Sequence, residues 1–276
     1  MAPAFNRNPE FELVFSEIFP AFDRAGRRLV VSSRGESANV ADSGLEAMNP
    51  DGSERRWVFR EDGKTVMSPE WSPQGDWIAF GLGTFFLGPT HPAQVAMIHP
   101  DGTGFRALTG PPNNNGFPSW SPDGKRIVYR TSSEKERGLR LMNLEDGKIT
   151  VLTTEYDNFP VWSPKGDLIA FTSFRDADFE VYTIHPDGTG VRRLTRTPGN
   201  DGHCVWSPDG QWLLFSSSRM GFKDEGPLFD GIPQPYGELF VMRADGSDVK
   251  QLTDNQWEDA TPAWQPERGR VQTSRR

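Results

Sequence analysis

The 276-residue sequence lacks features that several classes of protein require. Its one cysteine, Cys204, excludes an internal disulfide and any paired-cysteine metal or redox site, and we expect this thiol to be buried and inert. The net charge of −8, without a basic cluster, argues against a nucleic-acid partner held through its phosphates. No apolar run approaches the roughly 18 residues of a membrane-spanning helix, so no membrane partner is expected.

The N-terminal stretch lacks the basic start and the apolar core of a signal peptide. A cytoplasmic protein is therefore the first expectation, and we expect a monomer. The alternative is a periplasmic or secreted protein from which a leader peptide has been removed.

Turn-forming residues and aromatic rings are abundant. The chain has 28 glycines, 23 prolines, 19 phenylalanines and nine tryptophans, while apolar residues other than glycine make up only 35%. This composition favours short strands joined by tight turns, and hence an all-β fold. We expect the Trp and Phe rings to form the cores of the sheets rather than a ligand cage.

A short Trp-Ser-Pro motif recurs along the whole chain. Four plain copies and two degenerate ones begin at Trp71, Trp120, Trp162, Trp206, Phe22 and Trp264. In chain order the copies are 49, 49, 42, 44 and 58 residues apart, and a period in the low forties matches one four-stranded propeller blade. The sequence therefore predicts a six-bladed β-propeller of four-stranded blades, with residues 1–276 forming a single domain.

The two ends of the chain are expected to share the sixth blade. Too few residues follow Trp264 for a complete blade, whereas residues 4–6 and 11–15 read as two further strands. We predict that these N-terminal strands close the sixth blade with strands from the C-terminus. Such closure would remove exposed strand edges, which otherwise invite aggregation.

The repeat resembles a known family. The pattern P-x-W-S-P-D-G-x-x-I-A-F, followed by I-Y-x-x-x-x-D-G and L-T, is similar to the TolB-like propeller repeat and is matched closely at residues 160–164 and 187–195. The same repeat occurs in the propellers of tricorn-type proteases and dipeptidyl peptidases. The resemblance implies a propeller over nearly the whole chain and a protein or peptide partner that docks over the channel mouth. It implies no particular activity, because propellers host unrelated functions.

The predicted topology gives the propeller two different faces. The Ser-Pro-Asp-Gly turns after first strands and the Asp-Gly turns after third strands share one face, called here the turn-bearing face. The loops that enter first strands and those that join second to third strands share the other, the loop-bearing face. The second-to-third loops take ten residues in blades three and four but 14, 15 and 24 in blades one, two and five. Because insertions usually carry function, we predict that a protein, peptide or small-molecule ligand binds on the loop-bearing face.

Acidic side chains are expected around the channel mouth on that face. The positions five residues before each motif aromatic are Glu17, Val66, Asn115, Asp157, Asp201 and Asp259. Four carboxylates and an amide are oxygen ligands that suit a divalent cation such as Ca²⁺ or Mn²⁺, and an acidic rim would favour a basic partner segment. The alternatives are that these side chains bond to local backbone, or that Arg34, Arg175 and Arg219 neutralise them.

Blade five carries the least regular loop and an unusual histidine. Residues 220–236 mix proline, glycine, aromatic and charged residues, as a loop shaped over a cleft would. His203 is expected in the loop that enters the first strand of this blade, where blades three and four have Phe117 and Phe159. It either binds a ligand, a metal or a proton, or is simply packed. The candidate ligand-binding residues are Arg34, Asp157, Asp201, His203, Arg219, Lys223, Asp224, Tyr236 and Asp259.

An enzymatic function is the alternative hypothesis. At the level of the fold, the chain resembles propeller lyases that hold a divalent metal near the channel. The reaction would be metal-assisted cleavage of a small or sugar-like substrate, with metal ligands drawn from His91, His203 and Gln234. Asp201 or Glu225 would be the base, with His203 a further catalytic candidate. The sequence contains no nucleophile-elbow, zinc-protease or phosphate-loop motif, so whether the protein is catalytic stays open.

Overall fold

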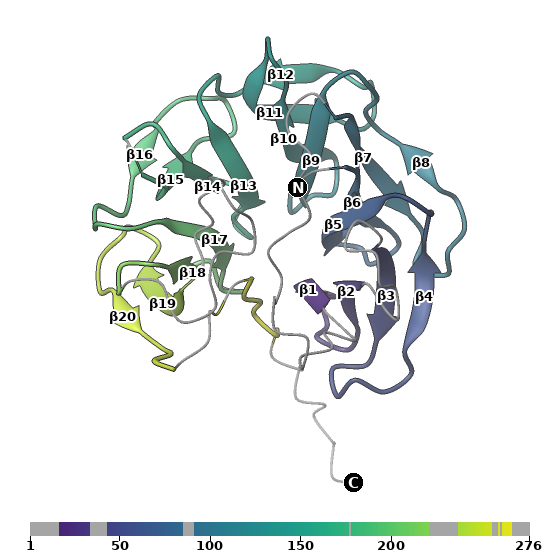
Figure 1. Ribbon diagram of the computed structural model, residues 1–276, viewed down its shortest axis with the longest axis horizontal. Helices are drawn as coiled ribbons and strands as arrows, with labels where there is room; N and C mark the ends of the chain where they lie inside the picture. The colour runs from purple at the N-terminus through teal and green to yellow at the C-terminus, as the bar shows by residue number, and fades with distance from the viewer. Residues whose placement is uncertain are drawn as a thin grey trace, which may run out of the picture.

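The computed structural model of the protein describes residues 17–33, 43–84, 91–176, 178–220, 237–255, 259 and 261–266. Over these ranges the regular structure is β-strand, and no described segment forms a helix that could cross a membrane. The strands make five four-stranded antiparallel units, each in chain order. Figure 1 shows these units, called blades one to five, fanned around a central axis with each first strand nearest to it. The expected all-β, propeller-like fold is therefore confirmed.

The strands have the following bounds. Blade one contains β1 (Glu17–Phe22), β2 (Leu29–Ser33), β3 (Gly44–Met48) and β4 (Arg56–Phe59). Blade two contains β5 (Thr65–Trp71), β6 (Ile78–Gly83), β7 (Ala93–Ile98) and β8 (Arg106–Ala107). Blade three contains β9 (Asn114–Trp120), β10 (Arg126–Ser132), β11 (Arg137–Asn143) and β12 (Ile149–Val151), and one parallel bridge joins it to blade two.

The remaining strands follow the same order. Blade four contains β13 (Asp157–Trp162), β14 (Ile169–Ser173), β15 (Glu180–Ile184) and β16 (Arg192–Arg193). Blade five contains β17 (Asp201–Trp206), β18 (Trp212–Ser217), β19 (Glu238–Arg243) and β20 (Lys250–Gln251). The second and third strands of the blades are largely buried, because neighbouring blades cover both of their faces.

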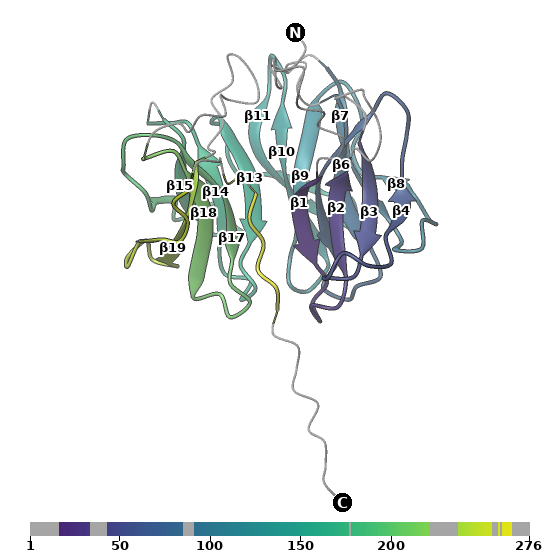
Figure 2. The same cartoon turned by 60° about the horizontal axis from the view of Figure 1, so that its bottom comes forward.

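A tight turn ends each first strand at the turn-bearing face. In blade three the amide of Gly124 donates to the carbonyl of Ser121 at 2.8 Å, and the hydroxyl of Ser121 accepts from the amide of Arg126 at 2.9 Å. Gly124 has a φ of 71°, which glycine adopts without strain. The equivalent glycine bond recurs at Gly75, Gly166 and Gly210. Figure 2 shows β1 from the side, running from the loop-bearing face at the top to the turn-bearing face at the bottom.

The motif tryptophans connect neighbouring blades. Four of the five motif tryptophans donate through the indole Nε1 to a backbone carbonyl of the preceding blade, one residue before that blade's own motif aromatic. The donor–acceptor pairs are Trp71 to Ala21 at 3.2 Å, Trp120 to Glu70 at 3.2 Å, Trp206 to Val161 at 3.1 Å and Trp264 to Val205 at 3.3 Å. The exception is Trp162, whose Nε1 is buried without a hydrogen-bond partner among the described residues and whose backbone amide donates to the Ser119 hydroxyl of blade three at 3.0 Å. The tryptophan of the repeat therefore fixes the distance between one blade and the next.

Each first strand contains one residue with a left-handed backbone, three positions before its motif aromatic. These residues are Phe19, Ser68, Phe117, Phe159 and His203, with φ between 48° and 55°. The strand register shifts at the same place in every blade, which marks a β-bulge. Because residues other than glycine seldom adopt this conformation, its recurrence shows that the blade repeat imposes it.

Four of these side chains meet at the propeller axis. Ring centroids are 4.5 Å apart between Phe117 and Phe159, 4.0 Å between Phe159 and His203, 5.9 Å between His203 and Phe19, and 6.2 Å between Phe19 and Phe117. The four rings form a closed circuit, called here the axial ring. Phe117 belongs to a small core cluster with Met67 and Ala93, and Phe19 and Phe159 pack against this cluster.

Residues 261–266 lie between blade five and blade one. Trp264 donates to Val205 of β17, while the side chain of Thr261 accepts from the amide of Phe19 at 3.0 Å. Gln265 Nε2 donates to the carbonyl of Gly26 at 3.3 Å, and Figure 1 shows the segment in yellow between β17 and β1. The expected strands at 4–6 and 11–15 lie outside the described residues. The count of six blades and closure by the termini therefore stay predictions.

Candidate functional site

Asp157 begins β13 and is held by an arginine of its own blade. The Arg175 guanidinium donates to both carboxylate oxygens of Asp157 at 3.0 Å, and the Asp157 side chain is fully buried. The same guanidinium lies 5.7 Å from the ring centroid of Phe171 and 4.8 Å from that of Tyr182. Buried charges need such pairing, because an isolated carboxylate in the interior is costly.

Asp201 begins β17 and repeats this arrangement in blade five. Arg219 donates to Asp201 Oδ2 at 2.9 Å and lies over the rings of Phe215 and Phe240, at 5.3 Å and 4.4 Å. Asp201 also accepts hydrogen bonds from the hydroxyls of Ser217 and Thr197.

The carboxylates of Asp157 and Asp201 are thus each engaged within their own blade. Arg175 and Arg219 neutralise them, which is the structural alternative to a shared cation site.

The other expected channel positions do not form a set of equivalent ligands. Val66 is apolar, and its backbone amide donates to the Ser43 hydroxyl at 2.8 Å. Asn115 is buried, while its neighbour Asn114 accepts from Arg130 at 2.6 Å. Asp259 pairs with Gly237 through the backbone and accepts from the Asn255 side chain at 3.0 Å. Glu17 begins β1, and its side chain is not among those described.

Several candidates lie outside the described residues. They are Arg34, Lys223, Asp224, Glu225, Gln234 and Tyr236. Their proposed roles in ligand binding, metal binding or catalysis remain predictions from the sequence.

His203 lies within β17 rather than in a loop. It is 5% exposed and packs against Phe159 and Phe19 in the axial ring. Burial lowers the pKa of His203 to about 3, because a charged imidazole would lose its hydration there. The side chain is therefore neutral at physiological pH and fills the place of a phenylalanine.

The two histidines suggested as metal ligands lie in different surroundings. His91 is exposed and precedes β7, and its backbone carbonyl accepts from Asn114 at 2.8 Å. His203 is buried at the axis. In the described part of the chain, no group of three His, Cys, Asp or Glu side chains could hold a metal ion. Cys204 is buried as expected, and burial raises the pKa of its thiol to about 12.

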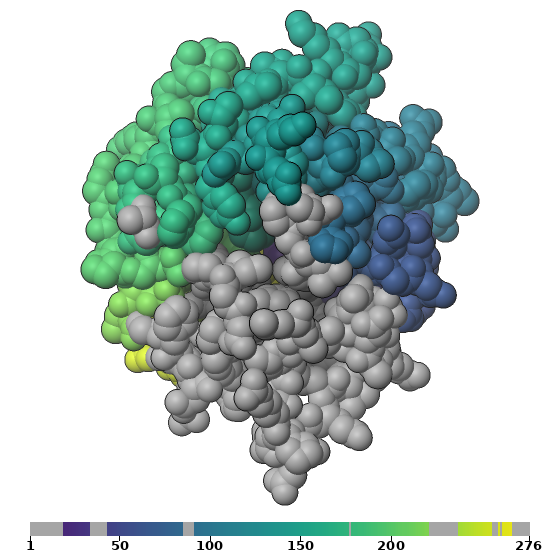
Figure 3. All heavy atoms as spheres, turned by 45° about the horizontal axis from the view of Figure 1, so that its top comes forward, coloured from purple at the N-terminus to yellow at the C-terminus, as the bar shows by residue number. Residues whose placement is uncertain are grey.

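Three aromatic rings gather on the loop-bearing face beside the Asp157–Arg175 pair. Tyr156 and Phe174 are 49% and 39% exposed, and both rings contact the buried Phe179, with centroids 6.1 Å and 5.0 Å from it. The amide of Phe174 donates to the carbonyl of Tyr156 at 3.0 Å, which fixes the two exposed rings relative to each other. These residues are called here the aromatic patch. Figure 3 views this face obliquely, with the teal and green atoms of blades three and four along its upper rim.

The aromatic patch was not found from the sequence, although a signal exists. Tyr156 immediately precedes the channel position Asp157, and Phe174 immediately precedes Arg175. Two aromatic residues adjacent to a predicted ion pair could have indicated an exposed cluster at the ends of β13 and β14.

A central pocket of about 290 Å³ lies at the axis beyond the axial ring, on the turn-bearing side. The inner part of its wall includes Phe19, Phe159 and His203, and the outer part includes Ser207 and Pro208 of a turn. The pocket therefore lies on the opposite side of the axial ring from the face on which we predicted binding. Sequence reasoning missed it.

Glu70 is the acidic side chain in the described wall of the central pocket. It is partly exposed, and its Oε1 accepts from the backbone amide of Trp120 at 3.3 Å. Burial raises the pKa of Glu70 to about 7, against the opposing hydrogen bonds from Ser119 and Trp120. The equivalent positions, each one residue before the motif aromatic, are Ala21, Ser119, Val161, Val205 and Ala263. A glutamate among small and apolar residues was a signal that the sequence offered.

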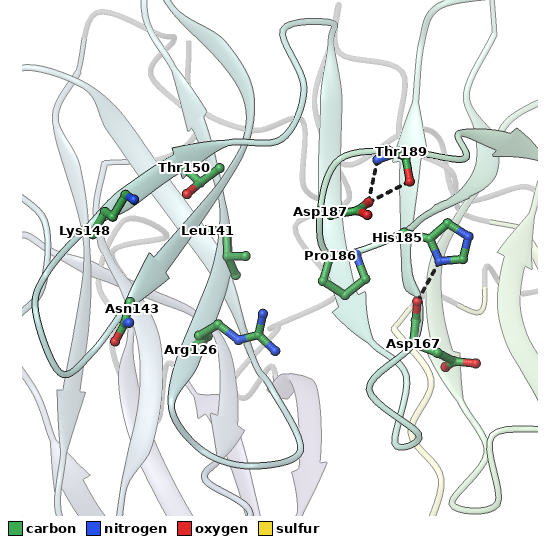
Figure 4. A pocket seen from close by; sticks show the side chains of 10 residues that line it. All are labelled: Arg126, Leu141, Asn143, Lys148, Thr150, Asp167, His185, Pro186, Asp187 and Thr189. Atoms are coloured by element: carbon green, nitrogen blue, oxygen red, sulfur yellow. Dashed lines mark hydrogen bonds between the residues drawn. The ribbon is translucent and has the colours of Figure 1, made fainter.

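A broader hollow of about 880 Å³ lies between blades three and four on the turn-bearing side. Figure 4 shows Lys148 and Thr150 on one side and the turn from His185 to Thr189 on the other. His185 Nδ1 lies 3.0 Å from the carbonyl oxygen of Asp167, while Asp187 accepts from the amide and hydroxyl of Thr189. These polar groups already have partners, which supports a structural role for this turn.

Comparison with known proteins identifies the family to which the chain is related. Residues 88–224 match the family described as the TolB beta propeller domain. The chain is a TolB-like β-propeller. A TolB homolog of Chlorobium luteolum is 32% identical over 122 residues, and the Tol-Pal system protein TolB of Gluconobacter oxydans is 33% identical over 110. These matches cover 44% and 40% of the chain but only 28% and 22% of the two relatives.

A longer match covers most of the TolB-like propeller. An uncharacterized protein of Agrobacterium fabrum is 28% identical over 213 residues, which are 74% of this chain and 64% of that protein. The chain therefore matches less than two thirds of the length of each of these relatives.

Solved structures agree on the fold. A protein of Agrobacterium tumefaciens with a provisional TolB name has a TM-score of 0.72 at 23% identity, covering 91% of this chain and 86% of its own. TolB of Acinetobacter baumannii has a TM-score of 0.70 at 17% identity, covering 91% and 58%. An oligogalacturonate lyase in complex with manganese has a TM-score of 0.56 at 14% identity, covering 87% and 66%. At these identities the likeness concerns the fold alone.

Proposed function

We propose that this TolB-like propeller is a binding module that docks a protein or peptide partner on its loop-bearing face. The observation that carries the proposal is the aromatic patch, in which Tyr156 and Phe174 are exposed side by side. Relatives named for TolB and for the Tol-Pal system support a protein partner rather than a metabolite.

The aromatic patch has the physical properties of an interface anchor. Large aromatic side chains contribute much of the binding energy in protein interfaces when they are held rigidly and become desolvated. Tyr156 and Phe174 are fixed by a backbone hydrogen bond and supported from below by Phe179. A partner that covers both rings would gain apolar burial without first having to order them.

The charge of the partner is less restricted than the sequence suggested. A basic segment was expected to meet an acidic rim, but Arg175 and Arg219 neutralise Asp157 and Asp201. Those two carboxylates therefore give no reason for a basic partner. We propose recognition centred on aromatic contact, with charges setting orientation and association rate.

Two finer features belong to the same proposal. We propose six blades, with residues 261–266 in the place of the sixth first strand, because they hydrogen-bond to both blade five and blade one. We also favour the exported alternative over the cytoplasmic expectation, since one relative carries the name of the Tol-Pal system.

Selection of peptides from a random phage-displayed library on the immobilised protein tests the proposal. We expect enriched peptides that bind the wild type and lose at least tenfold in affinity to the double variant Tyr156→Ser, Phe174→Ser. The matched control is Phe105→Ser, which removes a ring that is 42% exposed outside the aromatic patch. Selected peptides that bind the double variant as well as the wild type would overturn the proposal.

The enzymatic alternative has weaker support. It rests on likeness of fold to the oligogalacturonate lyase, at 14% identity. Among the described residues, Asp201 is engaged by Arg219, while His91 and His203 lie in different surroundings. Binding is therefore the function that we propose.

A further inference from the structure

We propose that the central pocket on the turn-bearing side is a second binding site, which takes an alkylammonium group against the carboxylate of Glu70. The group would be a free aliphatic amine or the side chain of a lysine in a peptide. The site is separated from the aromatic patch by the axial ring, so it is independent of the function proposed for the loop-bearing face.

The position of the Glu70 carboxylate is fixed by the neighbouring blade. Its Oε1 accepts from the backbone amide of Trp120 at 3.3 Å, and the Ser119 hydroxyl also hydrogen-bonds to it. Ser119 is held in turn, because its hydroxyl accepts from the backbone amide of Trp162 at 3.0 Å. The carboxylate is therefore oriented by three successive blades before any ligand arrives, which lowers the cost of binding.

Most of the rest of the wall is apolar. Prolines occupy five of the six equivalent positions two residues before the motif aromatics, and all five line the pocket: Pro20, Pro69, Pro118, Pro160 and Pro262. The rings of Phe19 and Phe159 close its inner end. An aliphatic chain would be buried against these groups, and aromatic faces attract an ammonium cation.

The number of anionic groups distinguishes an organic cation from a metal. The described wall offers one carboxylate, whereas a divalent cation such as Ca²⁺ takes six to eight oxygen ligands. One carboxylate balances the single charge of an ammonium group. A volume of about 290 Å³ is just below the roughly 300–1,000 Å³ of small-ligand pockets, which suits a short alkyl chain.

No other described group lining the pocket changes its charge near neutral pH. His203 is neutral because burial lowers its pKa to about 3, and Cys204 is neutral because burial raises its pKa to about 12. The serines, threonine, prolines and tryptophans of the wall do not titrate in this range. Glu70 alone among them gains or loses a proton around pH 7, with a raised pKa that burial causes.

Isothermal titration calorimetry with n-butylammonium chloride at pH 8 tests the site, with n-butanol as the uncharged ligand of similar shape. We expect n-butylammonium to bind at least tenfold more tightly than n-butanol. Glu70→Gln, which keeps the shape and removes the charge, should weaken n-butylammonium binding at least tenfold. The control Glu61→Gln removes an exposed carboxylate and should leave binding unchanged.

A second measurement does not depend on any variant. A bound ammonium group favours ionised Glu70, so the affinity of the wild type should fall about tenfold between pH 8 and pH 6. Near pH 7, binding should release a proton, seen as a heat that changes with the ionisation enthalpy of the buffer. Equal affinity at both pH values, or equal binding of n-butanol, would overturn the proposal.

The source of the ammonium group is decided by a third comparison. Gly-Lys-Gly with blocked termini is titrated beside n-butylammonium and cadaverine. Tighter binding of the blocked peptide indicates a lysine of a partner, and tighter binding of cadaverine indicates a free amine. Failure of all three ligands overturns the site, while the double variant of the aromatic patch should bind them normally.

Discussion

The imidazole of His203 lies 4.0 Å, centroid to centroid, from the ring of Phe159 at the propeller axis. Both residues have a left-handed backbone, with φ of 51° and 48°, at equivalent positions of neighbouring blades. His203 therefore occupies the place of a phenylalanine in a ring that separates the loop-bearing face from the central pocket. Several properties of the protein depend on this ring and on the groups beside it.

Replacing His203 by phenylalanine should remove a source of acid sensitivity. The pKa of His203 is about 3 in the folded protein and 6.5 without burial, so the unfolded state binds the extra proton first as the pH falls. Titration of His203 therefore leaves the free energy of unfolding unchanged above about pH 6.5 and lowers it progressively as the pH falls towards 3.

Relative to the wild type, the free energy of unfolding of His203→Phe should rise by up to about 1.4 kcal/mol for each pH unit below pH 6. Urea denaturation from pH 4.5 to 8 measures this difference. Phe is compatible with the backbone, because Phe19, Phe117 and Phe159 adopt the same conformation. A constant difference between the two proteins across the range would show that His203 does not titrate on unfolding.

Replacing Glu70 by glutamine should have the opposite dependence on pH. The pKa of Glu70 is raised from 4.5 to about 7, so the folded state holds the proton more tightly than the unfolded state. The associated stability is present at low pH and is lost as the pH rises through 7. Glu70→Gln should therefore be more stable than the wild type at pH 8 by about 1–3 kcal/mol, with the gap closing towards pH 5.

The two titrations oppose each other between about pH 4.5 and 6.5, so the wild-type profile alone does not separate them. Each variant has to be compared with the wild type at the same pH. For Glu70→Gln, a stability gap that widens on acidification would contradict the raised pKa.

Breaking the Asp201–Arg219 pair should destabilise the protein strongly. Asp201→Asn leaves Arg219, whose side chain is 14% exposed, beside a neutral group, and we expect a loss of about 3 kcal/mol in the free energy of unfolding. Adding Arg219→Met should recover much of this loss, because both charges are then absent. Chemical denaturation of the single and double variants gives the coupling energy.

The exposed pair of Asp248 and Lys250 provides the control. Its side chains are 40% and 59% exposed, and Asp248→Asn should change stability by less than about 0.5 kcal/mol. Similar losses for Asp201→Asn and Asp248→Asn would show that burial does not strengthen the first pair.

Removing divalent cations should leave the melting temperature unchanged. Asp157 and Asp201 already have arginine partners, so a channel cation, which was one of the alternatives from the sequence, has no free pair of carboxylates at these two positions. Thermal melting after EDTA treatment, and again after adding Ca²⁺ or Mn²⁺, checks this. A melting temperature that falls with EDTA and returns with one metal would revive the cation site, since bound ligand at 100 times its dissociation constant adds about 2.7 kcal/mol.

The blade repeat could be predicted from the sequence because its turn residues act on neighbours a few positions away. Ser121 and Gly124 each have a role that short-range chemistry defines: a cap for the turn and a left-handed backbone. Neutralisation of the acidic positions by Arg34, Arg175 and Arg219 was one of the alternatives to a cation site, but the sequence did not show which arginine pairs with which carboxylate.

The site itself was less predictable. His203 was singled out, but it was placed in a loop because the β-bulge that carries it into the axial ring depends on strand register. The aromatic patch combines Tyr156, Phe174 and Phe179 from the ends of three strands, so no single segment of the sequence predicts it. Glu70 differed visibly from its equivalents, yet only the packing of β5 against β9 gives it an oriented carboxylate in a pocket.

The sequence by itself determined the all-β blade architecture, since the turn chemistry acts within each blade and the motif recurs every 42 to 58 residues. Tertiary structure decided which side chains converge at the axis and which charges are cancelled by partners. Those outcomes depend on the bulge in each first strand and on contacts between blades, where residues some 50 positions apart in the chain come within hydrogen-bonding distance. The candidate sites of this propeller therefore depend on contacts between blades, whereas the strand pattern depends on the sequence within each blade.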